Sequence, residues 1–215
     1  MSQVSRLPVF ALAAALAVPV GAHRLDEVLQ GTLISIMADH VILEVNISPG
    51  VETVQRFLAL ADTSGDGLLS PDERETYARR VMDDIVLEID HQPTRLDLRQ
   101  SAFPPVDEMR AGLGTIRLAL RAQFPPVGGG DHQLYLRNNH APGISVYQVN
   151  ALVPVAGLEI LAQQRDPLQR EITIRYRSDA GSPGYPSRWP LVTGLGLVAL
   201  TAAFAERHLR RTAGL

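Results

Sequence analysis

Residues 62–73 read DTSGDGLLSPDE, and their oxygen-bearing residues have the spacing of a calcium-binding loop. A loop of the EF-hand type supplies ligands from its first, third, fifth, seventh, ninth and twelfth positions, because Ca²⁺ prefers about six to eight hard oxygen ligands. The residues at those positions are Asp62, Ser64, Asp66, Leu68, Ser70 and Glu73, of which Leu68 would bind through its backbone carbonyl. The sequence therefore predicts that these residues hold one Ca²⁺ ion.

Three loop residues bear on the choice of ion and on its affinity. Gly67 stands at the sixth position, where the backbone must turn sharply with a positive φ angle. Glu73 can bind through both carboxylate oxygens, which favours Ca²⁺ over the smaller Mg²⁺. Ser64 replaces the acid or amide common at the third position, and the sequence contains no second loop of this kind. We therefore expect the loop to bind calcium weakly.

Helices are expected on both sides of the loop, over residues 49–86. The pair Ser48 and Pro49 predicts the start of the first helix. Ser70 and Glu73 have the spacing of a capping box at the start of the second. The predicted apolar faces consist of Val51, Val54, Phe57 and Leu58 in the first helix and Tyr77, Val81 and Ile85 in the second. The alternative, a helix cap after an acidic turn, leaves the acids at the other ligand positions unexplained.

Strands with alternating apolar and polar residues make up the rest of the predicted domain. The clearest is TIRLALRAQF at residues 115–124, whose alternate residues from Ile116 to Phe124 are apolar. The other predicted strands are residues 29–36, 40–47, 85–89, 94–98, 133–137, 145–153, 157–162 and 171–177. Many short strands with polar turns favour a mainly β fold, an antiparallel β-sandwich. We expect one such domain over residues 23–177, with the helix-loop-helix inserted.

Both ends of the chain carry apolar segments that predict export and anchoring. Residues 1–22 have an uncharged stretch ending in Val-Gly-Ala, which is typical of a cleaved signal peptide; an uncleaved N-terminal anchor is the alternative. Residues 189–205 are uncharged and follow a linker at 178–188, so they predict one transmembrane helix; a buried terminal helix is the alternative. The arginine-rich tail at 206–215 would be cytoplasmic. These features predict a single-pass protein of the bacterial inner membrane, with its domain facing the periplasm or the cell exterior.

The composition excludes several classes of function. The formal net charge of the chain is -3, and between His23 and Arg188 the arginines number 16 against 22 acids. A chain with no basic field gives no support for binding nucleic acid. The absence of cysteine excludes disulfides, thiolate metal sites and cysteine nucleophiles.

The histidines and paired acids provide two alternative functions. His23 would follow the cleavage site, and His132 and His140 flank a predicted strand, where they could face one another or a metal ion. A periplasmic copper- or nickel-handling protein is therefore one alternative. No Ser-His-Asp order, phosphate loop or zinc spacing occurs, so the protein is not expected to be an enzyme, and an envelope hydrolase is the second alternative. The paired acids Asp83 and Asp84 are expected to form a solvated helix face.

The segments AHRLDEVLQGTLISI, DTSGDGLLSPDE and SVYQVNALVP, with the C-terminal anchor, together resemble a family of uncharacterised bacterial exported proteins with one EF-hand. The resemblance runs from Ala22 to the anchor. The domain is also distantly similar to the extracytoplasmic domain of membrane proteins linked to nickel supply, which implies an envelope β-domain and transition-metal handling. Neither resemblance carries catalytic residues. We expect a binding or scaffolding module with a structural calcium ion, whose partners are calcium, the inner membrane and another envelope or membrane protein.

Overall fold

A computed structural model describes residues 26–152, 154 and 156–179 of the chain. The predicted signal peptide, the transmembrane helix at 189–205 and the tail at 206–215 lie outside these residues, as does most of the linker. Within the described residues, no helix has the length and apolar character needed to cross a membrane. The described part is mainly β, with ten strands in two sheets and three helices.

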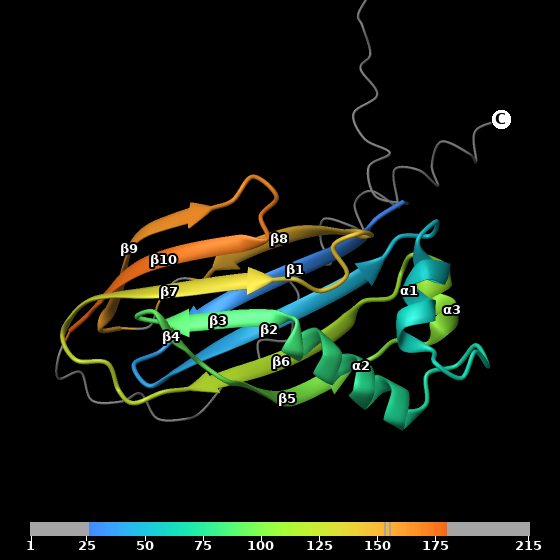
Figure 1. The fold of residues 1–215 in the computed structure, drawn as a ribbon, viewed down its shortest axis with the longest axis horizontal. Coiled ribbons are helices and arrows are strands. Elements are labelled where there is room, and N and C mark those ends of the chain that lie inside the picture. The colour runs from blue at the N-terminus through green and yellow to red at the C-terminus, as the bar shows by residue number, and fades with distance from the viewer. Residues whose placement is uncertain (1–25, 153, 155, 180–215) are drawn as a thin grey trace, which may run out of the picture. The chain divides into compact units, whose positions relative to one another are not determined.

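The first sheet has the strand order β5-β6-β2-β1-β8 (Figure 1). Its strands are β1 (Val28–Ile36), β2 (His40–Pro49), β5 (Leu96–Ala102), β6 (Ile116–Gln123) and β8 (Ser145–Ala151). The neighbours β1 and β2, β2 and β6, and β5 and β6 pair antiparallel. β1 and β8 pair parallel, so the expectation of purely antiparallel sheets is wrong for this pair. Two parallel strands need a long connection. Here the chain between β1 and β8 contains six strands, three of which belong to the second sheet.

The second sheet has the order β4-β3-β7-β10-β9, and all its neighbouring strands pair antiparallel. Its strands are β3 (Ile85–Ile89), β4 (Gln92–Pro93), β7 (Gly130–Asn138), β9 (Leu158–Arg165) and β10 (Glu171–Ser178). The nine predicted strands are therefore all present, and β4, only two residues long, is the additional one among the described residues.

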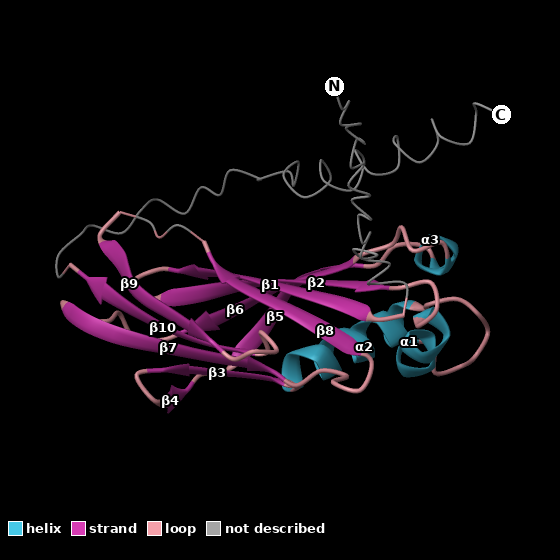
Figure 2. Cartoon of the chain, turned by 90° about the horizontal axis from the view of Figure 1, so that it is seen from above, coloured by secondary structure: helices cyan, strands magenta, loops and turns pink. Residues whose placement is uncertain are grey.

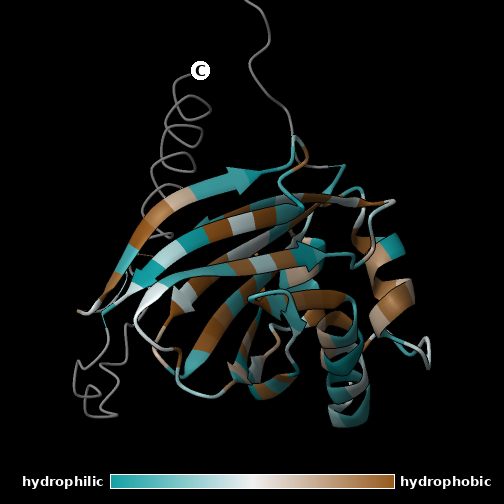
Figure 3. Cartoon of the chain, turned by 60° about the vertical axis from the view of Figure 1, so that its left-hand side comes forward, coloured by the Kyte–Doolittle hydropathy of each residue, from teal (hydrophilic) through white to brown (hydrophobic). Residues whose placement is uncertain are grey.

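Alternation along the strands puts one face of each sheet into a shared hydrophobic core. In β2 every second residue from Val41 to Ile47 has no exposed surface, and the same holds for Leu134 and Leu136 in β7. Residues of both sheets and of all three helices belong to one cluster of buried side chains. Figure 3 shows apolar and polar residues alternating along the strands. The period of two in the sequence thus determines which side chains are buried.

The three helices gather at one end of the sheets (Figure 2). They are α1 (Val54–Ala61), α2 (Pro71–Asp83) and α3 (Val106–Arg110). The predicted start of α2 is confirmed, because the Ser70 side chain accepts from the Glu73 N–H, the Glu73 side chain accepts from the Ser70 N–H, and Pro71 opens the helix.

The start of α1 differs from the prediction. Ser48 and Pro49 do not begin a helix but end β2, where the Ser48 hydroxyl hydrogen-bonds to the Thr115 hydroxyl at 2.7 Å. Proline is tolerated there because β2 pairs with β6 only as far as Ile47, so no hydrogen bond between strands is lost at Pro49. Val51 therefore precedes α1 and is 43% exposed, so its predicted place on the apolar face is wrong. Likewise Ile85 is buried, but as the first residue of β3 rather than in α2.

Candidate metal centre

The predicted calcium loop connects two helices that pack on the core. α1 ends at Ala61 and α2 begins at Pro71, so residues 62–70 form the connection. Phe57 of α1 and Tyr77 of α2 are almost fully buried, and their rings meet edge to face with centroids 5.4 Å apart. This contact fixes the spacing of the two helices and hence the two ends of the loop.

The Asp62 carboxylate organises the first half of the loop. Its Oδ1 accepts from the Gly65 N–H at 2.7 Å and from the Ser64 hydroxyl at 3.2 Å, and its Oδ2 accepts from the Gly67 N–H at 2.9 Å. Gly67 has a φ angle of 81°, the left-handed conformation expected at the sixth loop position. A side chain there would strain the backbone, which explains the glycine.

The Glu73 carboxylate closes the loop from the other end. Its Oε1 accepts from the Ser64 N–H at 2.9 Å and the Thr63 hydroxyl at 3.2 Å. Its Oε2 accepts from the Ser70 N–H at 2.9 Å and the Ser70 hydroxyl at 2.8 Å. The hydrogen bonds from the Ser64 backbone, then from the Ser70 backbone and hydroxyl, lower the pKa of Glu73 to about 2. Glu73 is therefore anionic at neutral pH, as a metal ligand must be.

The remaining predicted ligands lie on the exposed side of the loop. The Asp66 Oδ1 accepts from the Leu68 N–H at 2.8 Å, and the Leu68 side chain is 66% exposed. Leu69 points inward and is buried, and its carbonyl accepts from the Arg74 Nε at 2.7 Å. The eighth loop position thus attaches the loop to the core, while the seventh faces solvent.

The donor set fits a calcium ion in residue type, order and backbone conformation, but its acids do not converge. Across the described ranges, no three side chains of Asp, Glu, His or Cys gather closely enough to hold a metal ion. Asp62 and Glu73 meet at Ser64, from opposite ends of the loop, whereas Asp66 is turned to the Leu68 N–H. Ion binding would therefore require Asp66 and Glu73 to exchange hydrogen bonds within the loop for the cation, whereas the bond from the Gly67 N–H to Asp62 can remain. Thr63, which no ligand position includes, is one of the donors that would be released.

His132 and His140 belong to separate hydrogen-bonded groups. His132 in β7 bonds through Nδ1 to Asp90 at 2.8 Å and through Nε2 to the Gly128 carbonyl at 3.0 Å. His140 bonds through Nδ1 to Asp84 at 2.7 Å and through Nε2 to the Tyr77 hydroxyl at 2.9 Å. Each ring therefore has both nitrogens engaged with other residues. His23 lies outside the described residues.

The surroundings of His140 form a buried polar network that the sequence reading missed. Asp84 caps the C-terminal end of α2 and its side chain is 37% exposed, but it also accepts from the His140 ring, a contact that the prediction of a solvated helix face did not include. The Gln30 amide donates to the His140 carbonyl at 2.8 Å and accepts from the Asn138 amide at 2.9 Å. Burial lowers the pKa of His140, and the bond to Asp84 only partly opposes this. One residue could have indicated this network from the sequence: Gln30 is polar but stands at an inward-facing position of a predicted strand.

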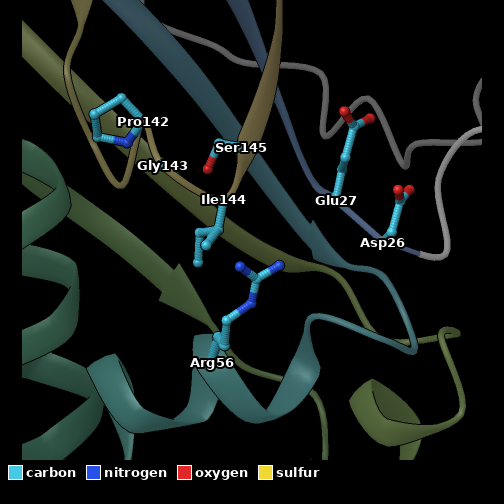
Figure 4. Close-up of a pocket in the computed structure, with 7 residues that line it drawn as sticks. All are labelled: Asp26, Glu27, Arg56, Pro142, Gly143, Ile144 and Ser145. Atoms are coloured by element: carbon cyan, nitrogen blue, oxygen red, sulfur yellow. The ribbon is translucent and has the colours of Figure 1, made fainter.

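A polar pocket of about 330 Å³ lies beside α1 (Figure 4). Arg56 of α1 extends its guanidinium into the space between Asp26 and Glu27 on one side and residues 142–145 on the other. The charged groups that line this pocket are Arg56, Asp26 and Glu27. They do not by themselves indicate a reaction or a particular ligand.

No known protein family matches this chain, and no curated protein matches its sequence. The resemblance to exported EF-hand proteins and to nickel-supply proteins therefore stays a prediction. The functional proposal depends on the loop itself.

Proposed function

We propose that this chain is a calcium-binding, membrane-anchored envelope protein. In this proposal the two sheets form a β-sandwich, the helix-loop-helix is an EF-hand, and the ion is structural in a binding or scaffolding module. The observation that carries it is the loop between α1 and α2. There Ser64 donates hydrogen bonds to both Asp62 and Glu73, and Gly67 has the left-handed conformation expected at the sixth position. A helix cap alone would require Ser70 and Glu73 but not the bonds made by Asp62.

The same geometry supports weak binding. Glu73 already accepts hydrogen bonds from two backbone N–H groups and two hydroxyls, which a cation must displace. Only three of the ligand side chains are anionic. We therefore expect a dissociation constant of about 10⁻⁴ to 10⁻³ M, the range of extracellular calcium modules.

A structural role is supported by the way the helices are attached. Sensor EF-hands open to expose an apolar groove, whereas Phe57 and Tyr77 here are buried in the common core. Tyr77 is also hydrogen-bonded to His140. With about 1 mM calcium outside the cell and a dissociation constant of about 10⁻⁴ M, binding would add about 1.4 kcal/mol to the free energy of unfolding. The melting temperature should rise by roughly 3 to 6 °C.

The envelope location is supported by the terminal segments of the sequence. A signal peptide at 1–22 and an anchor at 189–205 would hold the domain outside the cytoplasm, where calcium is abundant enough for a weak site. A domain without cysteine is compatible with an oxidising compartment.

Calcium calorimetry on the full chain tests the proposal. Glu73→Gln keeps the capping box, since glutamine can also accept from the N-cap N–H, but it removes the bidentate anionic ligand. Glu75→Gln is the matched control, because Glu75 is exposed and pairs with Arg79 on the surface of α2. We expect one ion per wild-type chain and per control chain, and at least tenfold weaker binding to Glu73→Gln. No heat at about 5 mM calcium, or equal affinity in all three proteins, would refute the proposal.

A further inference from the structure

The outer edge of β8 has backbone groups available for pairing. β8 ends its sheet and pairs only with β1 within the described residues (Figure 1). The Ile144 carbonyl accepts from the Val28 N–H, and the Leu152 N–H donates to the Ile34 carbonyl, both at 2.8 Å. Backbone groups alternate sides along a strand, so the odd-numbered residues of β8 direct their N–H and C=O groups away from β1.

Part of this edge is already occupied. The Val149 carbonyl accepts from the Arg165 Nε at 2.7 Å, and the Arg165 guanidinium also contacts the Asn150 side chain. Arg165 ends β9, so it caps the second half of the β8 edge. The stretch available for pairing is therefore at Ser145 and Tyr147.

A groove of about 340 Å³ lies along that same stretch. The turn between β9 and β10, residues 167–170, forms its opposite wall. Pro142, Val146 and Leu168 contribute apolar surface to it, and Leu168 is 67% exposed. The groove thus combines unpaired strand edge with apolar walls, the two elements of recognition by strand addition.

The charge of the groove differs from that of the domain. Arg170 lines it and no acid does, although the domain is acidic as a whole. The nearby Asp166 carboxylate is used within the turn, where it accepts from the Leu168 and Glu171 N–H groups at 3.1 and 2.7 Å. A ligand at this edge would therefore meet Arg170 as the one charged side chain among the residues that line the groove.

We propose that this groove binds an extended acidic segment of a partner protein, which adds to the edge of β8. Its backbone pairs with Ser145 and Tyr147, an apolar side chain rests against Val146 and Leu168, and a carboxylate faces Arg170. The segment is short, because only Ser145 and Tyr147 offer outward backbone groups along the groove before Arg165 caps the edge at Val149. This inference is independent of calcium binding.

The probe is an acetylated, amidated hexapeptide of alternating valine and aspartate, added to the full chain in detergent. Amide hydrogen exchange should slow at Tyr147, whose N–H faces the groove. Leu168→Glu should weaken binding at least tenfold, because it removes an apolar contact and repels the aspartates. Leu113→Glu is the matched control: Leu113 is 80% exposed, lies outside the groove and should leave binding unchanged.

Two further peptides test the mechanism. Replacing aspartate by lysine should abolish binding, and N-methylation of alternate peptide amides should abolish it as well. Equal binding of the lysine peptide, equal binding of the methylated peptide, or no binding at about 1 mM would each overturn the proposal. Protection of Tyr147 that rises with protein concentration, without peptide, would assign the edge to a second copy of the chain and overturn it too.

Discussion

Replacing Tyr77 by phenylalanine should destabilise the protein through a single lost hydrogen bond. The Tyr77 side chain is 2% exposed, and its hydroxyl lies 2.9 Å from the His140 Nε2. Phenylalanine keeps the ring and its edge-to-face contacts with Phe57 and Phe103, at centroid distances of 5.4 and 6.2 Å. No cavity larger than an oxygen atom is created, so packing should change little.

The expected loss follows from the burial of both partners. A buried nitrogen left without its hydrogen bond costs about 1–3 kcal/mol. Because Nδ1 bonds to the Asp84 carboxylate, Nε2 is the nitrogen that accepts from the Tyr77 hydroxyl, and it has no other hydrogen-bond donor among the described residues. For a domain of this size, a loss of about 2 kcal/mol lowers the melting temperature by roughly 4–8 °C.

Tyr176 provides a matched control within the same core. It is 1% exposed, but its hydroxyl has no hydrogen-bond partner among the described residues. Tyr176→Phe should therefore be neutral or slightly stabilising, since it removes an unsatisfied buried hydroxyl. Urea unfolding of both variants measures the difference. A change within about 0.5 kcal/mol for both would refute the reasoning that the network around His140 stabilises the fold.

Two other predictions concern pH and topology. Burial lowers the pKa of His140 below 6.5, although the bond to Asp84 acts in the opposite direction. On acidification His140 is therefore protonated in the unfolded chain before it is protonated in the folded one, so the free energy of unfolding should fall as the pH drops below 6.5. Burial also disfavours the charged form of His132, but the hydrogen bonds to Asp90 and the Gly128 carbonyl outweigh it and raise the pKa of His132. The stability that His132 contributes is therefore lost as the pH rises. Urea unfolding at about pH 7.5 and 5.5 measures how far the midpoint falls on acidification. The fall should be smaller in His140→Gln than in the wild type and larger in His132→Gln, and the same fall in all three proteins would contradict this. A reporter active only outside the cytoplasm should work when fused after Ser182 and fail after Leu215; activity in the second fusion alone would reverse the orientation.

Local patterns predicted most of the strands because burial here follows a period of two. The stretch from Ile116 to Ala122 alternates in sequence and in exposure, so its inward face could be named without the structure. The start of α2 was equally local, since Ser70 and Glu73 cap each other across three residues. These features depend on neighbours in the chain, and such neighbours are visible in a sequence.

Other features depend on residues far apart in the chain and could not be predicted. The parallel pairing of β1 with β8 joins Val28 to Ser145, and no local signal sets that register. The network at His140 unites residues more than 50 positions apart, such as Tyr77. The short α3 was missed because five residues after a proline pair do not show a helical period.

The same division applies to the candidate metal centre. The order of the candidate ligand residues is local and can be read from the sequence. The hydrogen bond that Glu73 accepts from the Ser64 N–H across the loop is tertiary, and it determines how readily the Glu73 carboxylate becomes available to a cation.

The amide resonance of Gly67 during a calcium titration tests the central claim most directly. Its N–H donates to the Asp62 Oδ2 at 2.9 Å. A divalent cation on that carboxylate would hold the acceptor in place and polarise the bond, so the amide proton should move downfield and saturate at one ion per chain. Gly112, which also has a positive φ angle but lies outside the loop, serves as the reference. A Gly67 signal that stays in place, or moves only together with that of Gly112, at about 10 mM calcium would contradict the assignment of this loop as a calcium site.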